Sequence, residues 1–206
     1  MNPVANKVVI LGRDGTLNEY REDHVKAPEE WIPLPGALEA VARLHHAGWH
    51  VVVATNQSGI GRGMIDMASL NAVHAHMLQL LHRVGGRIDA VFFCPHTPEE
   101  ECDCRKPLPG MMKQIGQRYG IDLRHVPVVG DTGRDLQAAL AAGCEPHLVR
   151  TGRAGALDDA QIARMVAAAA GTQVHKDLAA FADFLLHRER AERGIDAEDS
   201  IPGALI

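Results

Sequence analysis

The sequence predicts an α/β fold in which helices pack around a doubly wound parallel sheet. Short runs rich in β-branched residues alternate along the chain with longer segments that carry apolar residues at helical spacing. The chain has 206 residues, of which 46% are hydrophobic, and this is enough for one domain with a full core. Such alternation implies right-handed crossovers, and the ligand site of a doubly wound sheet lies beyond the carboxyl ends of its strands.

The individual elements follow from these patterns in chain order. Five buried strands are predicted at residues 7–11, 49–55, 88–94, 126–130 and 146–150. Four helices are predicted at residues 37–48, 66–84, 110–120 and 134–143, and several of them end at glycine, as helix C-termini often do. An alanine-rich stretch to which no element is assigned follows Arg150, and an amphipathic helix is expected at about residues 176–187. We therefore expect a single domain over residues 1–188 and a poorly ordered, charged tail over residues 189–206.

Charge and hydropathy exclude several classes of partner. The net charge of -5 and the isoelectric point near 6.2 provide no basic surface for nucleic acid. No apolar run approaches the ~18 residues that span a bilayer, and no N-terminal stretch has the features of a secretory signal. We expect a cytoplasmic protein, monomeric by default, that acts on a small molecule and binds neither nucleic acid nor membrane.

Polar residues gather in the loops that follow four of the predicted strands. These loops are GRDGTLN at residues 12–18, TNQSGIGRG at 55–63, CPHTPEEECDCRKPLPG at 94–110 and GDTGRD at 130–135. Hydrolysis of a phosphate monoester needs a nucleophile, charge neutralisation on the phosphoryl oxygens and a proton for the leaving alkoxide. Asp14 lies where it could give a proton to the leaving group and later take one from water. Considered without the other loops, this aspartate could equally serve only to accept hydrogen bonds from the backbone amides of a turn.

The second loop offers groups for phosphate binding. Thr55 ends its strand and can present its hydroxyl to a phosphoryl oxygen, and Asn56, Gln57 and Ser58 add short polar groups around it. Arg62 is a cation at the centre of a glycine-rich stretch, where it is suited to a second phosphate or to sugar hydroxyls. Alone, these features would indicate only a strand cap and a flexible loop.

The third and fourth loops add cations and a site for a hard metal ion. Arg105 can make a planar fork to substrate oxygens, although an Arg-Lys pair is ordinarily a solvated charge. Asp131 can offer a carboxylate oxygen to magnesium, and Asp135, one helical turn later, is either an outer support of that ion or a helix cap. Magnesium usually binds one or two carboxylates together with a phosphate, so this site requires an anionic substrate.

The third loop also carries a candidate zinc site. Cys94, His96, Cys102 and Cys104 offer three thiolates and one imidazole over eleven residues. Four such ligands fit tetrahedral zinc in a closed, structural site, and the acidic residues around them argue against packed, reduced cysteines. Because the loop leads directly into Arg105 and Lys106, we expect the zinc to hold these two cations in position.

Taken together and in this order, the four loops resemble the haloacid dehalogenase superfamily of phosphotransferases, over roughly residues 7–153. Within it they are similar to the D-glycero-D-manno-heptose 1,7-bisphosphate phosphatases of lipopolysaccharide-core precursor synthesis. The resemblance implies a Rossmann-like haloacid dehalogenase fold without a large cap domain, and a magnesium-dependent phosphoric monoester hydrolase that removes the 7-phosphate. It also implies that Asp14 is the general acid/base, that Asp14 and Asp131 bind magnesium, and that Thr55 and Lys106 contact the transferring phosphoryl group.

One residue departs from the family pattern. The motif is DRDGT, whose first aspartate attacks phosphorus and binds magnesium, and this chain has Gly12 at that place. We therefore expect a severely impaired enzyme. Two alternatives remain: a histidinol-phosphate phosphatase, which shares the zinc loop and the phosphate cradle, and a noncatalytic sugar-phosphate-binding protein, which Gly12 favours. The stretch SGIGRG, with its extra cation, favours the bisphosphatase over the first of these.

Overall fold

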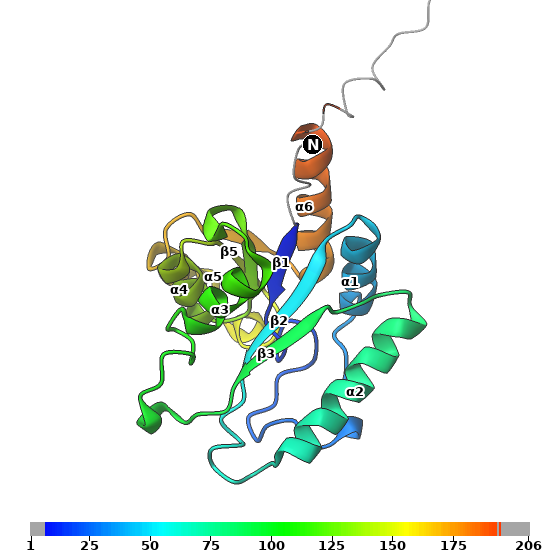
Figure 1. The fold of residues 1–206 in the computed structure, drawn as a ribbon. Coiled ribbons are helices and arrows are strands. Elements are labelled where there is room, and N and C mark those ends of the chain that lie inside the picture. The colour runs from blue at the N-terminus through cyan, green and yellow to red at the C-terminus, as the bar shows by residue number, and fades with distance from the viewer. Residues whose placement is uncertain (1–6, 193, 195–206) are drawn as a thin grey trace, which may run out of the picture.

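The computed structural model describes residues 7–192 and 194, and its six strands form one parallel sheet of order β3-β2-β1-β4-β5-β6 (Figure 1). The strands are β1 (Val8–Leu11), β2 (His50–Asn56), β3 (Ala90–Cys94), β4 (Pro127–Gly130), β5 (Glu145–Val149) and β6 (Gln173–His175). The ends of the first five strands lie within two residues of the predicted ends. The doubly wound α/β prediction is confirmed.

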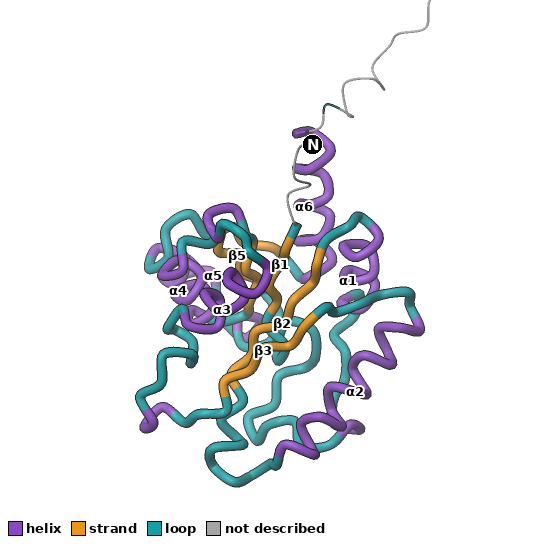
Figure 2. Tube along the Cα trace, in the orientation of Figure 1, coloured by secondary structure: helices purple, strands orange, loops and turns teal. Residues whose placement is uncertain are grey.

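Helices cover both faces of this sheet (Figure 2). They are α1 (Ala37–His46), α2 (Met67–Arg83), α3 (Gly110–Tyr119), α4 (Gly133–Ala142), α5 (Asp159–Ala167) and α6 (Leu178–Glu192). Alternate residues of β1 point to opposite faces, as successive side chains of a strand must. Val9 and Leu11 join a core with α1, α2 and α6, whereas Val8 and Ile10 join a second core with α3 and α4. Among the described residues, no helix is long and apolar enough to cross a bilayer.

The C-terminal part of the chain contains more structure than the sequence patterns predict. Strand β6 and helix α5 lie in the stretch to which no element was assigned. Helix α6 runs to Glu192, beyond its expected end near His187, because its last turns are held from outside: Arg188 pairs with Glu145 at 2.8 Å and Glu189 accepts a hydrogen bond from Trp49. The start of the expected tail is therefore helical, and residues 193 and 195–206 of it lie outside the described residues.

The topology positions one site. The chain winds from β1 through β2 to β3 on one side and from β4 through β5 to β6 on the other, so the sheet order reverses between β1 and β4. There Leu11 pairs with Val129, and the amide of Gly12 donates to the carbonyl of Val129 at 2.8 Å. The four polar loops leave β1, β2, β3 and β4 at this edge, where ligands of such sheets bind.

Candidate active site

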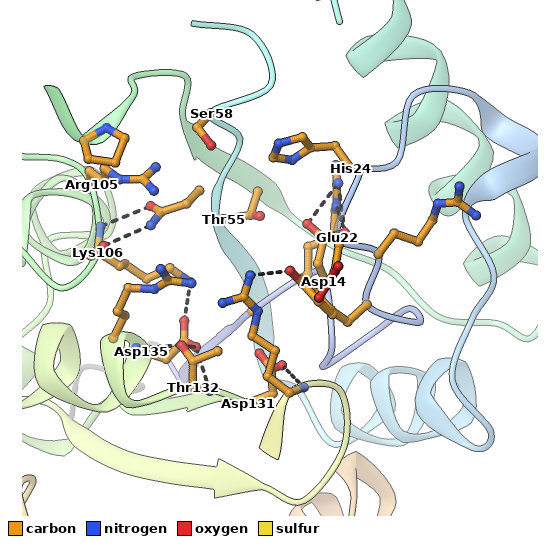
Figure 3. Close-up of a pocket in the computed structure, with 18 of the residues that line it drawn as sticks. Asp14, Glu22, His24, Thr55, Ser58, Arg105, Lys106, Asp131, Thr132 and Asp135 are labelled. Atoms are coloured by element: carbon orange, nitrogen blue, oxygen red, sulfur yellow. Dashed lines mark hydrogen bonds and ion pairs between the residues drawn. The ribbon is translucent and has the colours of Figure 1, made fainter. Parts of the chain in front are cut away.

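A cavity of about 390 Å³ lies beyond the carboxyl ends of β1, β2 and β4 (Figure 3). Ten of the predicted site residues line it: Gly12, Asp14, Thr55, Asn56, Ser58, Arg62, Arg105, Lys106, Asp131 and Asp135. They come from four loops that are up to 123 positions apart in the chain. The structure thus brings the predicted phosphate-binding residues to one place.

Asp14 is held by three neighbours. The Arg13 guanidinium, whose side chain is fully buried, donates to both carboxylate oxygens at 3.0 Å, and Asn18 and Gln57 donate to them at 3.0 and 2.8 Å. Burial opposes ionisation, but Arg13 and these hydrogen bonds outweigh it and hold the pKa of Asp14 below its ordinary value. His74 of α2 contacts the far side of the guanidinium, with 3.1 Å between its Nε2 and Nη1. The Asp14 carboxylate is therefore held in one orientation at the edge of the cavity by three side chains.

Gln57 does not lie where a substrate contact is expected. It is 1% exposed and is not among the residues that line the cavity. Its side-chain amide donates to Asp14 and, at 2.9 Å, to the hydroxyl of Thr55, so it fixes two cavity residues from behind. The sequence prediction placed Gln57 among the substrate-binding residues, but its side chain is buried and turned inward, where both hydrogen bonds hold it.

Lys106 is anchored by both its backbone and its side chain. Asn56 exchanges two hydrogen bonds with the Lys106 backbone, at 3.0 and 3.1 Å, which ties the third loop to the end of β2. The Lys106 ammonium donates to the carbonyl of Ala54 at 2.8 Å and forms a buried ion pair with Asp135. Asp135 also forms a capping box with Thr132 at the start of α4, so it is a helix cap and the partner of the lysine at once.

Asp131 follows β4 and is buried against two glycines. Gly15 and Gly152 have φ values of 78° and 51°, and a Cβ on either would lie 2.1 or 2.3 Å from a carboxylate oxygen of Asp131. The amide of Arg153 donates to the same oxygen at 2.8 Å. Burial and the nearby Asp135 carboxylate raise the pKa of Asp131 to about 7. A buried carboxylate that is difficult to ionise and faces a cavity is chemically suited to a divalent cation.

The four predicted zinc ligands converge. Ligand atoms of Cys94, His96, Cys102 and Cys104 all lie within 4.8 Å of one another, and the distance from His96 Nδ1 to Cys104 Sγ is 3.3 Å. Burial opposes ionisation of Cys102, but hydrogen bonds from Cys104 and Cys94 lower its pKa to about 7. This donor set fits a tetrahedral metal ion. Beyond it, Arg105 donates to the carbonyl of His96 at 3.1 Å, which links the cluster to the cavity wall.

A side chain at position 12 would be compatible with the backbone but would require the Thr16 side chain to shift. Gly12 does not adopt a positive φ, so its backbone does not require glycine. A Cβ built there would lie 2.8 Å from Thr16 Oγ1, with the next atoms at 3.5 and 3.6 Å. This hydroxyl is buried and has no hydrogen-bond partner among the described residues.

Several cavity residues were not predicted from the sequence. Tyr20, His24, Arg134 and Arg153 also line it. The Arg153 guanidinium lies 4.3 Å from the centre of the Tyr20 ring and donates to its hydroxyl, which joins the loops after β1 and β5. His24 has a φ of 64°, a left-handed conformation that is uncommon for histidine. Arg153 could have been predicted as well, because it follows the fifth strand, and residues that follow parallel strands meet at the same edge of the sheet. Tyr20 and His24 lie in a long loop that contains no recognisable motif.

The fold and this cavity define a haloacid dehalogenase-like hydrolase. Residues 103–181 match a family model described as HAD-hydrolase-like. The chain is 52% identical over 186 residues to the D-glycero-β-D-manno-heptose-1,7-bisphosphate 7-phosphatase of Bordetella bronchiseptica, an alignment that covers 87% of this chain and 98% of that protein. It is 46% identical over 183 residues to the enzyme of the same name from Pseudomonas aeruginosa, covering 89% and 99%. The chain belongs to the D-glycero-D-manno-heptose 1,7-bisphosphate 7-phosphatase family.

Solved structures agree with this assignment. The crystal structure of D,D-heptose 1,7-bisphosphate phosphatase from B. bronchiseptica, complexed with magnesium and phosphate, has a TM-score of 0.81 at 51% identity and covers 88% of this chain and 99% of that one. The corresponding enzyme from Burkholderia thailandensis has a TM-score of 0.65 at 51% identity and covers 87% and 98%.

Proposed function

We propose that this chain carries the scaffold of a phosphatase that removes the 7-phosphate from D-glycero-D-manno-heptose 1,7-bisphosphate, and that Gly12 leaves this copy severely impaired. The observation that carries the proposal is the convergence of Asp14, Lys106 and Asp131 on one cavity beside residue 12. The family relationship supplies the substrate.

Each cavity residue has a task in this proposal. Asp14 gives a proton to the leaving sugar oxygen and later takes one from water. The ammonium of Lys106 and the hydroxyl of Thr55 neutralise or hydrogen-bond the phosphoryl oxygens. Ser58, Arg62 and Arg105, which also line the cavity, bind the remaining oxygens of the substrate, and Arg105 does so by a bidentate fork.

Two metal ions complete the proposed site. Asp131 would hold magnesium together with Asp14, and the ion would supply positive charge next to the phosphoryl oxygens. Cys94, His96, Cys102 and Cys104 would hold a structural zinc ion. The hydrogen bond from Arg105 to His96 supports a mechanical role for that zinc, because it connects the cluster to a cavity cation.

Gly12 changes the balance between binding and turnover. Removal of a catalytic nucleophile while the rest of a site remains costs on the order of 10⁴–10⁶ in turnover. Binding is less affected, because the loss of a magnesium ligand is opposed by the loss of a negative charge that would face the phosphate. Gly12 therefore also favours a second candidate, a sugar-phosphate-binding protein without catalysis.

Equilibrium binding tests the scaffold separately from turnover. Calorimetric titration of the unaltered chain with heptose 1,7-bisphosphate and magnesium should give saturable binding, tighter than titration with histidinol phosphate. Arg62→Gln should weaken the binding about tenfold or more through loss of a charged hydrogen bond. Arg83→Gln, which changes an exposed arginine of α2 outside the cavity, is the matched control. No binding, or equal effects of the two variants, would contradict the proposal.

A further inference from the structure

A histidine of helix α2, which is not among the residues that line the cavity, contacts the arginine that holds Asp14. We propose that His74 is a positioning residue: its neutral ring accepts a hydrogen bond from Arg13 and so fixes the guanidinium group that orients the Asp14 carboxylate. This inference rests on the proposed function, in which Asp14 is the general acid/base. It extends the set of residues on which turnover depends from the strand-end loops to α2.

The Arg13 guanidinium binds a different residue on each of its two sides. Its Nε and Nη2 donate to Asp14 Oδ1 at 3.2 and 3.0 Å, and Nη2 also donates to Oδ2 at 3.0 Å. Its Nη1 lies 3.1 Å from His74 Nε2. Because a guanidinium is rigid and planar, a contact that fixes Nη1 also fixes the plane in which the other two nitrogens meet the carboxylate.

The chemistry of the two side chains determines the direction of this hydrogen bond. Arginine carries donors and no acceptor, so His74 Nε2 must accept. The proton of the neutral imidazole is then on Nδ1, because one ring nitrogen donates and the other accepts. Burial, followed by the charge of Arg13, lowers the pKa of His74 to about 4, which agrees with a neutral ring at pH 7.

Arg13 needs this acceptor because its side chain is fully buried. Within the described part of the chain, Asp14 and His74 are the hydrogen-bond partners of its guanidinium. A buried charged donor that loses its acceptor is costly, so without the imidazole the guanidinium would turn toward another acceptor. Such a turn would also move the nitrogens that hold Asp14.

His74 itself is held on a rigid element. It lies beside the buried face of α2, where Val73 and Met77 are both 0% exposed. Its ring is also near that of Phe93 of β3, with 6.5 Å between the ring centroids. A side chain that is supported by a packed helix fixes its partner more precisely than a residue on a loop does.

Spectroscopy of the unaltered chain tests the hydrogen bond directly. Two-bond ¹H–¹⁵N NMR spectra of the imidazole rings at pH 7 should show a neutral His74 with its proton on Nδ1. The Nη protons of Arg13 should give separate signals, since a guanidinium that is bonded on both sides rotates slowly. A protonated His74 ring, or a proton on its Nε2, would overturn the inference.

Three substitutions of His74 separate positioning from packing. His74→Gln should retain the Arg13 spectrum, because its amide oxygen is as many bonds from Cα as Nε2 is. His74→Asn places the same group at the shorter reach of Nδ1, and His74→Leu provides volume without an acceptor, so both should merge the Arg13 Nη signals. His76→Leu, on the same helix and outside the cavity, is the matched control. Equal spectra for the three variants at residue 74 would contradict a positioning role.

Turnover is measured in the Gly12→Asp background, where the proposed nucleophile is present. There His74→Leu and His74→Asn should lower kcat by about tenfold or more with little change in KM, because Asp14 transfers its proton in the transition state. His74→Gln should keep most of the rate. Equal kcat values in all of these variants would overturn the inference. An inactive Gly12→Asp chain would instead contradict the proposed function, and the NMR spectra would still decide whether His74 positions Arg13.

Discussion

The ammonium group of Lys106 and the carboxylate of Asp135 form an ion pair that is buried between the third loop and the first turn of α4. The pair joins a cation of the cavity to a helix cap, since Asp135 also bonds to Thr132. The position of the Lys106 ammonium at the cavity thus depends on its pairing with the residue that also caps α4.

Asp135→Asn should destabilise the protein strongly. Loss of one partner of a buried pair leaves an uncompensated charge, at a cost of about 3–5 kcal/mol in the free energy of unfolding. Urea denaturation measures this. The control is Asp159→Asn, which breaks the exposed pair between Arg150 and Asp159 and should cost less than about 1 kcal/mol. Similar losses in the two variants would show that the Lys106–Asp135 pair is not important for stability.

Removal of zinc should weaken phosphate binding as well as the fold. Cys102→Ser removes one of the four clustered ligands, and the loop that carries Arg105 should then lose its anchor at His96. Metal content by mass spectrometry, melting temperature and phosphate affinity should all fall. Cys144→Ser, at a buried cysteine outside the cluster, should leave the metal content unchanged. Unchanged phosphate affinity in the zinc-free protein would refute the mechanical role.

A buried histidine pair should make the protein less stable in mild acid. His147 of β5 is 1% exposed, its Nδ1 lies 3.1 Å from His175 Nε2, and burial, followed by the effects of His175 and Arg188, lowers its pKa to about 3. Because the unfolded chain, with a histidine pKa near 6.5, binds the proton first, this group stabilises the fold above pH 6.5 and its contribution is lost as the pH falls.

This effect should amount to about 2 kcal/mol between pH 7.5 and pH 5. His147→Gln, which cannot be protonated, should be less stable at pH 7.5 but should lose less stability on acidification. Chemical denaturation of both proteins at several pH values gives the slope of the free energy of unfolding against pH for each. Parallel curves for the two proteins would mean that His147 is not responsible for the acid sensitivity.

The sequence predicts most of the sheet and most of the cavity wall. Buried parallel strands have continuous apolar runs, and polar residues directly after them must meet at one edge, so Asp14, Thr55 and Asp131 could be placed together in advance. Strand β6 could not be predicted from the sequence, because its three residues form an edge strand with little burial and so have no continuous apolar run. The extent of α6 depends on distant partners such as Glu145, which no local pattern reveals.

The direction in which a side chain points is the second feature that the sequence does not predict. Spacing indicates that Gln57 lies near the cavity, but only the folded structure shows that its side chain is hydrogen-bonded to Asp14 rather than facing a substrate. Arg13 is similar: the sequence shows a charged residue next to Asp14, and only packing decides that its guanidinium is buried against His74 rather than solvated. Both residues position Asp14, a role without a sequence signature.

The most direct measurement compares phosphate release from heptose 1,7-bisphosphate by the unaltered chain and by Gly12→Asp, with magnesium present. The backbone at residue 12 does not require glycine, and the Thr16 side chain, 2.8 Å from a Cβ built there, must shift to accept the new residue. We predict a gain of about 10⁴-fold or more in turnover, abolished when Asp14→Asn is added. Equal rates for the unaltered chain and Gly12→Asp would contradict the assignment of residue 12 as the nucleophile position.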